Sequence, residues 1–176
     1  IKLNLDYSFS DKLDFTTSNL FTQSIADNRA QGVFGSLMNT DPNADLYLTN
    51  EDGSPYKVNV NTIAQSANPL YNIANSVNNA RTERLLSFFA LKYRPLNFLS
   101  FEASYGTDRS RGEYFSLTPK GRLDYSLNPT KGSISRTNVM GRNQTVQLEG
   151  SYFKKFGDFN TRLKTQYMYE SENYNS

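Results

Sequence analysis

Ile1-Lys2-Leu3-Asn4-Leu5-Asp6-Tyr7-Ser8-Phe9, the stretch that opens the chain, alternates strictly between apolar and polar residues. Successive side chains of a β-strand point to opposite faces, so the stretch predicts a strand with one apolar and one polar face. A soluble sheet with one wet face gives the same pattern over a single strand. Because the pattern recurs between short turns and long polar segments, it favours the wall of a transmembrane β-barrel.

Five further stretches carry this alternation, and together the six predict three hairpins. The strands are expected near residues 1–10, 13–23, 83–94, 99–107, 144–155 and 159–170. The turns that join them in pairs are Asp11-Lys12, Pro95-Leu96-Asn97 and Gly157-Asp158. A tilted strand of about ten residues is long enough to cross the hydrocarbon core of a bilayer.

The apolar positions of these strands define a surface that we expect to face lipid. A charge at the bilayer midplane costs about 2–4 kcal/mol, and mid-strand charges such as Lys92 and Glu149 fall at the opposite, polar positions. Tyr and Phe gather near the strand ends, which is typical of membrane interfaces. The alternative is that these aromatic residues form the core of a soluble β-domain. The residues predicted to face lipid are Leu3, Leu5, Tyr7, Leu13, Phe15, Phe89, Leu91, Phe101, Val146, Leu148, Leu163 and Tyr167.

The composition excludes several classes of function. The chain has no Cys and no His, so disulfides, conventional zinc sites and His-based catalytic triads are ruled out within it. A net charge of +2 is too small to indicate a nucleic-acid-binding protein. The mean hydropathy is −0.64 and no apolar run reaches the length of a transmembrane helix. We therefore expect neither an enzyme nor a cofactor, and the absence of His disfavours an outer-membrane hydrolase.

Two long polar segments, near residues 24–81 and 108–143, are predicted to be extracellular loops, with the short turns on the periplasmic side. In the first loop, the turn signal Asn50-Glu51-Asp52-Gly53 predicts a small hairpin between 46–48 and 56–58. Asn68-Pro69 predicts a short helix with Asn as its cap and Pro in its first turn. The second loop has no clear periodicity.

Six strands are too few to close a barrel, because eight is the smallest common number and an open sheet leaves bare backbone groups in lipid. The chain begins at Ile1 within a strand pattern, so we expect it to belong to a longer or processed chain. The fold class expected is an all-β, antiparallel barrel segment of about six strands. The alternative is a small standalone outer-membrane barrel, an anchor or adhesin, with two more strands hidden near 46–48 and 56–60.

Several motifs resemble the SusC/RagA-type TonB-dependent transporters of Bacteroidetes, and the resemblance covers most of residues 1–106. The opening hairpin also looks like the one that precedes the first long loop in that family. The motifs differ from the family pattern at Arg94, where Lys is commoner, and at Phe98, where Trp is frequent. The motifs that carry the resemblance are Asn50-Glu51-Asp52-Gly53-Ser54, Asn68-Pro69-Leu70, Arg81-Thr82-Glu83-Arg84-Leu85-Leu86 and Tyr93-Arg94-Pro95-Leu96-Asn97-Phe98-Leu99-Ser100-Phe101.

The resemblance implies a 22-stranded outer-membrane barrel with an N-terminal plug that imports glycans or peptides too large for porins. It also implies a SusD-like surface lipoprotein as a lid, TonB as the source of energy, and contact with outer-membrane lipid and lipopolysaccharide. Neither a plug nor a TonB-contacting motif is recognisable in this chain.

Candidate sites in the loops each have a second interpretation. Asp41, Asn43, Asp45 and Asp52 space oxygen ligands as a calcium loop does, but Leu46 occupies the position that needs glycine, and a solvated acidic turn is the alternative.

The second loop holds candidate contacts for substrate or partner. Arg109 and Arg111 are candidates to bind acidic sugars or lipopolysaccharide phosphates, because the Arg guanidinium forks onto such groups, with a solvated loop end as the alternative. Tyr114, Phe115 and Tyr125 are candidates to stack on sugar rings, or to pack the loop itself.

Overall fold

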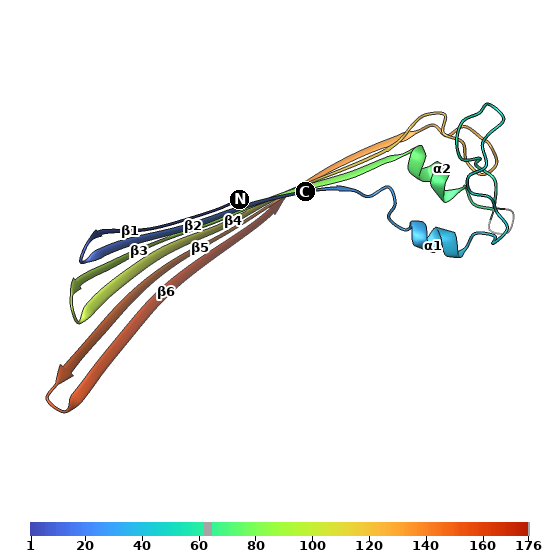
Figure 1. Cartoon of the computed structure of the whole chain (residues 1–176). Helices are drawn as coiled ribbons and strands as arrows, with labels where there is room; N and C mark the ends of the chain where they lie inside the picture. The colour runs from blue at the N-terminus through green and yellow to red at the C-terminus, as the bar shows by residue number, and fades with distance from the viewer. Residues whose placement is uncertain (62–64, 176) are drawn as a thin grey trace. The chain divides into compact units, whose positions relative to one another are not determined.

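The computed structural model describes residues 1–61 and 65–175 of the chain. Figure 1 shows that most of these residues lie in strands. The elements in chain order are β1 (Lys2–Ser10), β2 (Leu13–Asp27), α1 (Val33–Met38), α2 (Pro69–Ala74), β3 (Val77–Leu96), β4 (Leu99–Thr118), β5 (Ser133–Phe156) and β6 (Phe159–Asn175). Neither described helix is long and apolar enough to span a membrane.

The six strands form one antiparallel sheet in which each strand pairs with its neighbour in the sequence, and β1 and β6 lie at its two edges (Figure 1). The expected all-β fold and the three hairpins are confirmed. The turn Gly157-Asp158 has two residues, with Phe156 paired to Phe159, and Gly157 has a φ of 56° as such tight turns require. Pro95 and Leu96 belong to β3, so the second turn is shorter than expected.

The strands are longer than the sequence pattern indicated. β4 continues to Thr118 and β5 begins at Ser133, so most of the predicted loop 108–143 is strand. β2 and β3 likewise extend into the predicted loop 24–81, to Asp27 and from Val77. Alternation marks a strand only where one of its faces is apolar, and these extensions are mostly polar on both faces. Their backbone pairing holds them in the sheet without leaving that signal.

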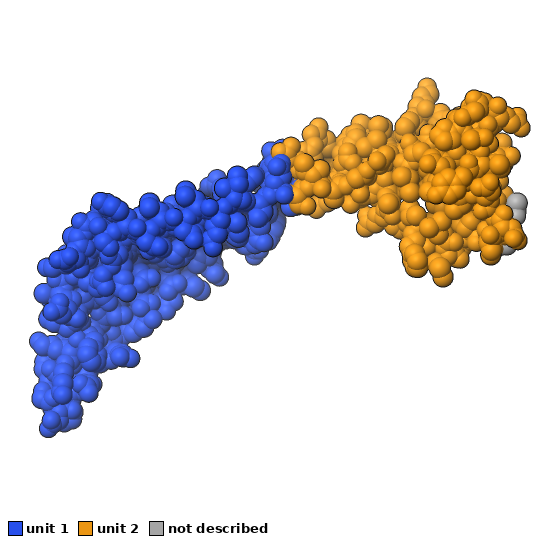
Figure 2. Space-filling model, viewed as in Figure 1, with its two compact units in different colours: residues 1–23, 82–112, 139–176 blue, residues 24–81, 113–138 orange. Residues whose placement is uncertain are grey.

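The chain forms two compact units (Figure 2), and strands β2 to β5 contribute residues to both. Unit 1 contains residues 1–23, 82–112 and 139–176, and its described residues are strands and hairpin turns only. Unit 2 contains residues 24–81 and 113–138, including both helices. The buried apolar residues of the described chain, Val58 and Tyr71, both lie in unit 2. Unit 1 is therefore a single-layer sheet without an apolar core of its own.

Unit 2 is organised around a buried asparagine, Asn68. Its Nδ2 donates to the carbonyl oxygens of Leu46, at 2.8 Å, and Lys57, at 3.0 Å. Its Oδ1 accepts from the backbone N–H of Leu70, at 3.0 Å, which caps helix α2. Because Pro69 follows in the first turn, the helix that the sequence predicted here is confirmed.

The prediction of a small hairpin between 46–48 and 56–58 is wrong, although the turn between these stretches forms. The Asn50 N–H donates to the Ser54 carbonyl at 2.9 Å, but no described residue between 46 and 60 lies in a strand. Tyr56 has a φ of 64°, which breaks the extended backbone. The Asn68 amide donates to the carbonyls of Leu46 and Lys57, on either side of the turn. The two extra strands that a small standalone barrel requires are thus absent from this described segment.

Helix α1 was not expected from the sequence. Its N-cap, Gly32, makes no side-chain capping bond, and Gly35 lies within the helix, so the usual start signals are missing. None of its residues is buried, and Phe34 and Met38 expose 77% and 72% of their surface. The helix therefore presents apolar side chains to its surroundings.

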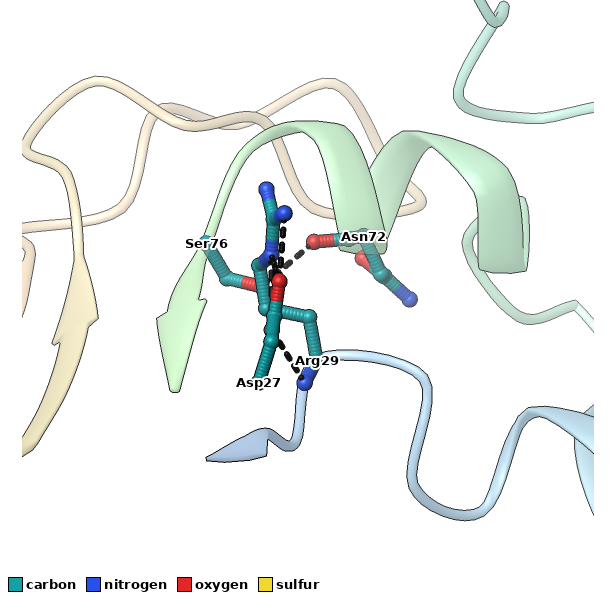
Figure 3. A network of polar contacts seen from close by, with 4 residues as sticks. All are labelled: Asp27, Arg29, Asn72 and Ser76. Carbon is teal, nitrogen blue, oxygen red and sulfur yellow. Dashed lines mark hydrogen bonds and ion pairs between the residues drawn. The ribbon is translucent and has the colours of Figure 1, made fainter. Parts of the chain in front are cut away.

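A polar network lies in unit 2, around the end of β2 (Figure 3). The Arg29 guanidinium donates to both carboxylate oxygens of Asp27, at 2.6 to 3.0 Å, and the Arg29 backbone N–H donates to Oδ1. The side-chain hydrogen bonds from Arg29 hold the pKa of Asp27 below its ordinary value. The Ser76 hydroxyl donates to the Asn72 carbonyl at 2.6 Å.

Candidate functional site

The strand register assembles the predicted lipid-facing residues into one surface, which we call the apolar face. In the first hairpin Leu5 lies opposite Thr17 and Tyr7 opposite Phe15. Opposed residues of an antiparallel pair share a face, so one side of this hairpin is apolar as expected.

The third hairpin repeats the arrangement. Leu148 lies opposite Tyr167, and Tyr152 lies opposite Leu163. On the other side Glu149 lies opposite Gln166. The alternation of apolar and polar residues in the sequence therefore becomes a division between two faces of the paired strands.

Side-chain contacts carry the apolar face across the inner strands. The ring of Phe89 on β3 stacks on that of Tyr105 on β4, with centroids 6.4 Å apart. The Tyr105 hydroxyl accepts a hydrogen bond from Gln144 on β5. A Cβ placed on Gly150 of β5 would lie 3.7 Å from the Phe101 ring. The face is thus continuous over β3, β4 and β5.

Most of the apolar face is exposed. Leu148 exposes 49% of its surface and Leu163 exposes 64%, while Leu13, Phe15 and Val146 are half-buried by their neighbours. The exposed members among the predicted lipid-facing residues are Leu3, Leu5, Tyr7, Phe89, Leu91, Phe101, Leu148, Leu163 and Tyr167. A sheet normally buries its apolar face against another layer, and unit 1 has none among its described residues.

The opposite side of unit 1, which we call the polar face, carries ion pairs between neighbouring strands. Lys164 contacts Glu149 at 2.9 Å, and Arg84 contacts Asp108 at 2.5 Å. Arg94 pairs with Asp14 between β3 and β2. These side chains are partly exposed, so each pair contributes little to stability, but they place formal charge on one side of the sheet.

The hairpin-turn end of the apolar face carries an aromatic cluster with one cation. Phe98 meets Tyr152 edge to face, with centroids 5.7 Å apart. Lys154 lies in the apolar-face register opposite Thr161, and its Nζ lies 5.0 Å from the Phe98 ring and 5.2 Å from the Phe156 ring. A lysine beside rings is suited to a boundary between apolar and aqueous surroundings.

At its other end the apolar face meets a shallow groove of about 350 Å³ lined by arginines. Arg109 and Arg111 lie on β4 and Arg142 lies on β5, and all three are exposed. Apolar side chains, among them Phe21 and Leu85, line the same groove. Arg109 and Arg111 were expected in a loop, but they belong to a strand, which fixes their spacing and their face.

The sequence did not single out Arg142. Within β5 it lies two residues before Gln144, whose side chain bonds Tyr105 of β4. Only the pairing of β4 with β5 brings Arg142 beside Arg109 and Arg111. No local motif could have indicated this, because the two stretches are about thirty residues apart in the chain.

The aromatic candidates for sugar stacking do not form a common platform. Tyr114 and Phe115 are consecutive residues of β4, so their side chains point to opposite faces of the strand. Tyr125 lies outside the strands, between β4 and β5, and is half-buried.

The calcium loop is not assembled. The Asp41 carboxylate accepts from the Asn43 N–H at 3.0 Å, and Asp45 accepts from the Tyr47 N–H at 2.9 Å. Asp52 accepts from the Ser54 hydroxyl at 2.6 Å and from its N–H, and these bonds hold the pKa of Asp52 below its ordinary value. Among the residues that the structure describes, no three acidic, His or Cys side chains gather as a metal site would need. The carboxylates instead close local turns.

Neither the models of known protein families nor the curated proteins include a match to this chain.

Proposed function

We propose that this chain forms part of the wall of an outer-membrane β-barrel that imports large nutrients. The observation that carries the proposal is the two-faced, single-layer sheet of unit 1, with an exposed apolar face and ion pairs on the other side. Lipid acyl chains suit such a face, because they are apolar and neither donate nor accept hydrogen bonds. The polar face would then line a hydrated lumen.

The backbone supports the same proposal. Each strand is hydrogen-bonded to its neighbours except at the outer edges of β1 and β6. Bare backbone groups in hydrocarbon cost several kcal/mol each, so we infer that further strands pair with these two edges in the complete barrel. A meander in strict chain order is the arrangement that barrels of this kind extend by adding hairpins.

The import function rests on the resemblance to SusC/RagA-type transporters. In that family a SusD-like lipoprotein covers the outer face of the barrel and TonB supplies energy, so both are proposed partners. Unit 2 is suited to such a contact, because it has a packed interior around Val58 and Asn68 and still exposes Phe34, Leu37 and Met38 on α1. An ordered surface with exposed apolar side chains is typical of a protein interface.

The experiment uses the full-length protein that carries this sequence, tagged and expressed in its own host. We expect it to fractionate with the outer membrane, to show heat-modifiable mobility, and to co-purify with a surface lipoprotein. Deletion of the gene should abolish growth on one large glycan or peptide, and loss of TonB should reproduce that defect. Substituting serine at Phe34 and Met38 should weaken the co-purification, while the control Asn128→Ala on an exposed turn should leave it unchanged.

Two results would contradict the proposal at different levels. A soluble protein without heat-modifiable mobility would overturn the barrel. An outer-membrane barrel whose deletion leaves growth on every large nutrient intact would overturn import and favour the anchor or adhesin instead.

A further inference from the structure

Three arginines stand at one end of the apolar face without a carboxylate partner. Within the described residues, Arg109, Arg111 and Arg142 form no ion pair, whereas Arg84, Arg94 and Arg136 each do. Glu83 also lines the groove, but its carboxylate accepts from the Gln23 amide at 3.2 Å. The groove therefore holds an excess of positive charge that the protein itself does not neutralise.

Strand geometry places these arginines on the side of the apolar face. Side chains two residues apart on a strand share a face and lie about 7 Å apart, so Arg109 and Arg111 follow Tyr105 on its side of β4. On β5, the adjacent strand, Arg142 lies two residues before Gln144 and therefore on its side, and the bond from Gln144 to Tyr105 shows that both series share one side. Neighbouring strands are about 4.8 Å apart, so the three guanidinium groups can reach a common ligand.

The three arginines lie beyond the Tyr105–Gln144 contact, at increasing distance from it. Arg142 is two, Arg109 four and Arg111 six residues beyond this contact, which is about 7 to 20 Å along the strand. For a strand tilted by about 40° this is about 5 to 15 Å along the membrane normal. The headgroup region of one leaflet is about 5 to 8 Å thick, so with Tyr105 at the edge of the hydrocarbon Arg142 lies within that region and Arg109 and Arg111 lie at and beyond its outer side.

The groove combines this charge with apolar walls. Phe21, Leu85 and Met140 line it together with the arginines. Guanidinium groups fork onto phosphate oxygens, and apolar walls suit acyl chains, so the site fits an anionic amphiphile better than a free sugar acid.

We propose that Arg109, Arg111 and Arg142 bind the phosphate groups of a lipid in the outer leaflet, of the lipid A class, on the outside of the barrel. This inference rests on the proposed function, because it requires the apolar face to lie in the bilayer. It assigns the arginines to the lipid boundary rather than to the nutrient path.

The test uses the full-length protein, purified in detergent after heat-modifiable mobility has shown that the barrel is folded. Native mass spectrometry measures the binding of lipid A and of the same lipid A after enzymatic removal of its phosphates. We expect the wild-type protein to bind the phosphorylated form at least about tenfold more tightly, as charge-assisted hydrogen bonds to phosphate allow. Inorganic phosphate at the same concentration should not displace it, since a free anion makes no contact with the apolar walls.

Two matched variants each remove three positive charges, one from the side of the apolar face and the other from the polar face. The triple variant Arg109→Gln, Arg111→Gln, Arg142→Gln should bind both forms equally. The control Lys2→Gln, Lys92→Gln, Lys155→Gln removes the same charge from the polar-face register and should keep the wild-type preference.

The outcomes separate this inference from the proposed function. A folded wild-type barrel that binds both lipid forms alike overturns the lipid site alone, and this result does not depend on how well any variant folds. Complete displacement by inorganic phosphate also overturns it, in favour of a free-anion site. If the lysine control also loses the preference for phosphorylated lipid A, that preference is due to net charge and not to the three arginines, and the lipid site is overturned. If the protein does not insert into the outer membrane, the proposed function fails and the lipid site fails with it.

Discussion

At the scale of single residues, the side chain of Asn68 joins three segments of unit 2. It is fully buried, and its amide bonds carbonyls on both sides of the 50–54 turn while its oxygen caps α2. A buried amide that satisfies each of its neighbours is costly to replace, because every lost bond leaves a buried group unsatisfied.

We expect Asn68→Ala to destabilise unit 2 by about 2–4 kcal/mol, from the lost cap and two orphaned carbonyls. Hydrogen exchange should report this as amides of residues 46–72 exchanging at least about 30-fold faster, while the strands of unit 1 keep their protection. Asn68→Asp keeps the acceptor for the Leu70 N–H but places a carboxylate against the carbonyls of Leu46 and Lys57. It should therefore destabilise unit 2 at least as much as Asn68→Ala does. Unchanged exchange in both variants would contradict the role of Asn68.

Asp27 offers a pH-dependent test. Because Arg29 lowers the pKa of Asp27 in the folded protein, the pair adds stability above the ordinary carboxyl pKa and loses it as the pH falls through the lowered value. We expect the carboxyl ¹³C shift of Asp27 to titrate below the ordinary range, and Arg29→Gln to move this titration toward that range, although the backbone N–H of residue 29 still donates to the carboxylate. The same titration in both proteins would show that Arg29 does not hold the carboxylate in solution.

At the scale of elements, each strand of a hairpin turns one set of alternate residues to each face, so neighbouring positions should respond differently to mutation. In β5, Leu148 lies on the apolar face and Glu149 on the polar face, paired with Lys164. The proposed function makes one position lipid-facing and the other lumenal.

We expect Leu148→Arg to impair barrel assembly, since an arginine near the bilayer midplane costs about 2–4 kcal/mol. Leu5→Arg in β1 should act in the same direction. Glu149→Ala and Lys2→Ala should leave assembly intact, because a partly exposed ion pair contributes at most about 1 kcal/mol. Heat-modifiable mobility of the full-length variants measures this, and equal folding of both sets would mean that the faces are assigned wrongly.

At the scale of the whole molecule, the proposed function predicts which segments lie outside the cell. The chain has no Cys, so introduced cysteines report on topology without background from it. Gly53 and Gly132 are poor sites, because both have a positive φ and a Cβ on Gly132 would meet the Lys120 backbone at 2.7 Å. Glu51, Ser126 and Asp158 are exposed and suit the purpose.

We expect Glu51→Cys and Ser126→Cys to react with an impermeant maleimide on intact cells. Asp158→Cys, in the short turn between β5 and β6, should react only after the outer membrane is breached. Short turns face the periplasm in such barrels, whereas long connections face outward. Labelling of Asp158→Cys on intact cells would invert the orientation.

Much of the sheet could be predicted because its signals are local. The alternation in β1 and β5 marks strand and face together, and Asn68-Pro69 marks the start of α2. The strands of the hairpin expected at 46–58 do not form, because Tyr56 has a positive φ and the two cross-turn backbone bonds, from Asn50 to Ser54 and from Lys57 to Leu48, do not extend into a ladder. Arg109 and Arg111 were identified as candidates, but their place on a strand was not.

The sequence by itself determined that the chain is all-β, that it forms three hairpins and which side chains share a face. These properties depend on neighbours one or two residues apart, which the period of a strand makes visible. The tertiary structure alone decided how far β4 and β5 continue, that Asn68 is buried between Leu46 and Lys57, and that Arg142 joins the groove of Arg109 and Arg111. Each of these depends on backbone pairing or burial between residues distant in the chain, and a polar stretch carries no period that records its partner.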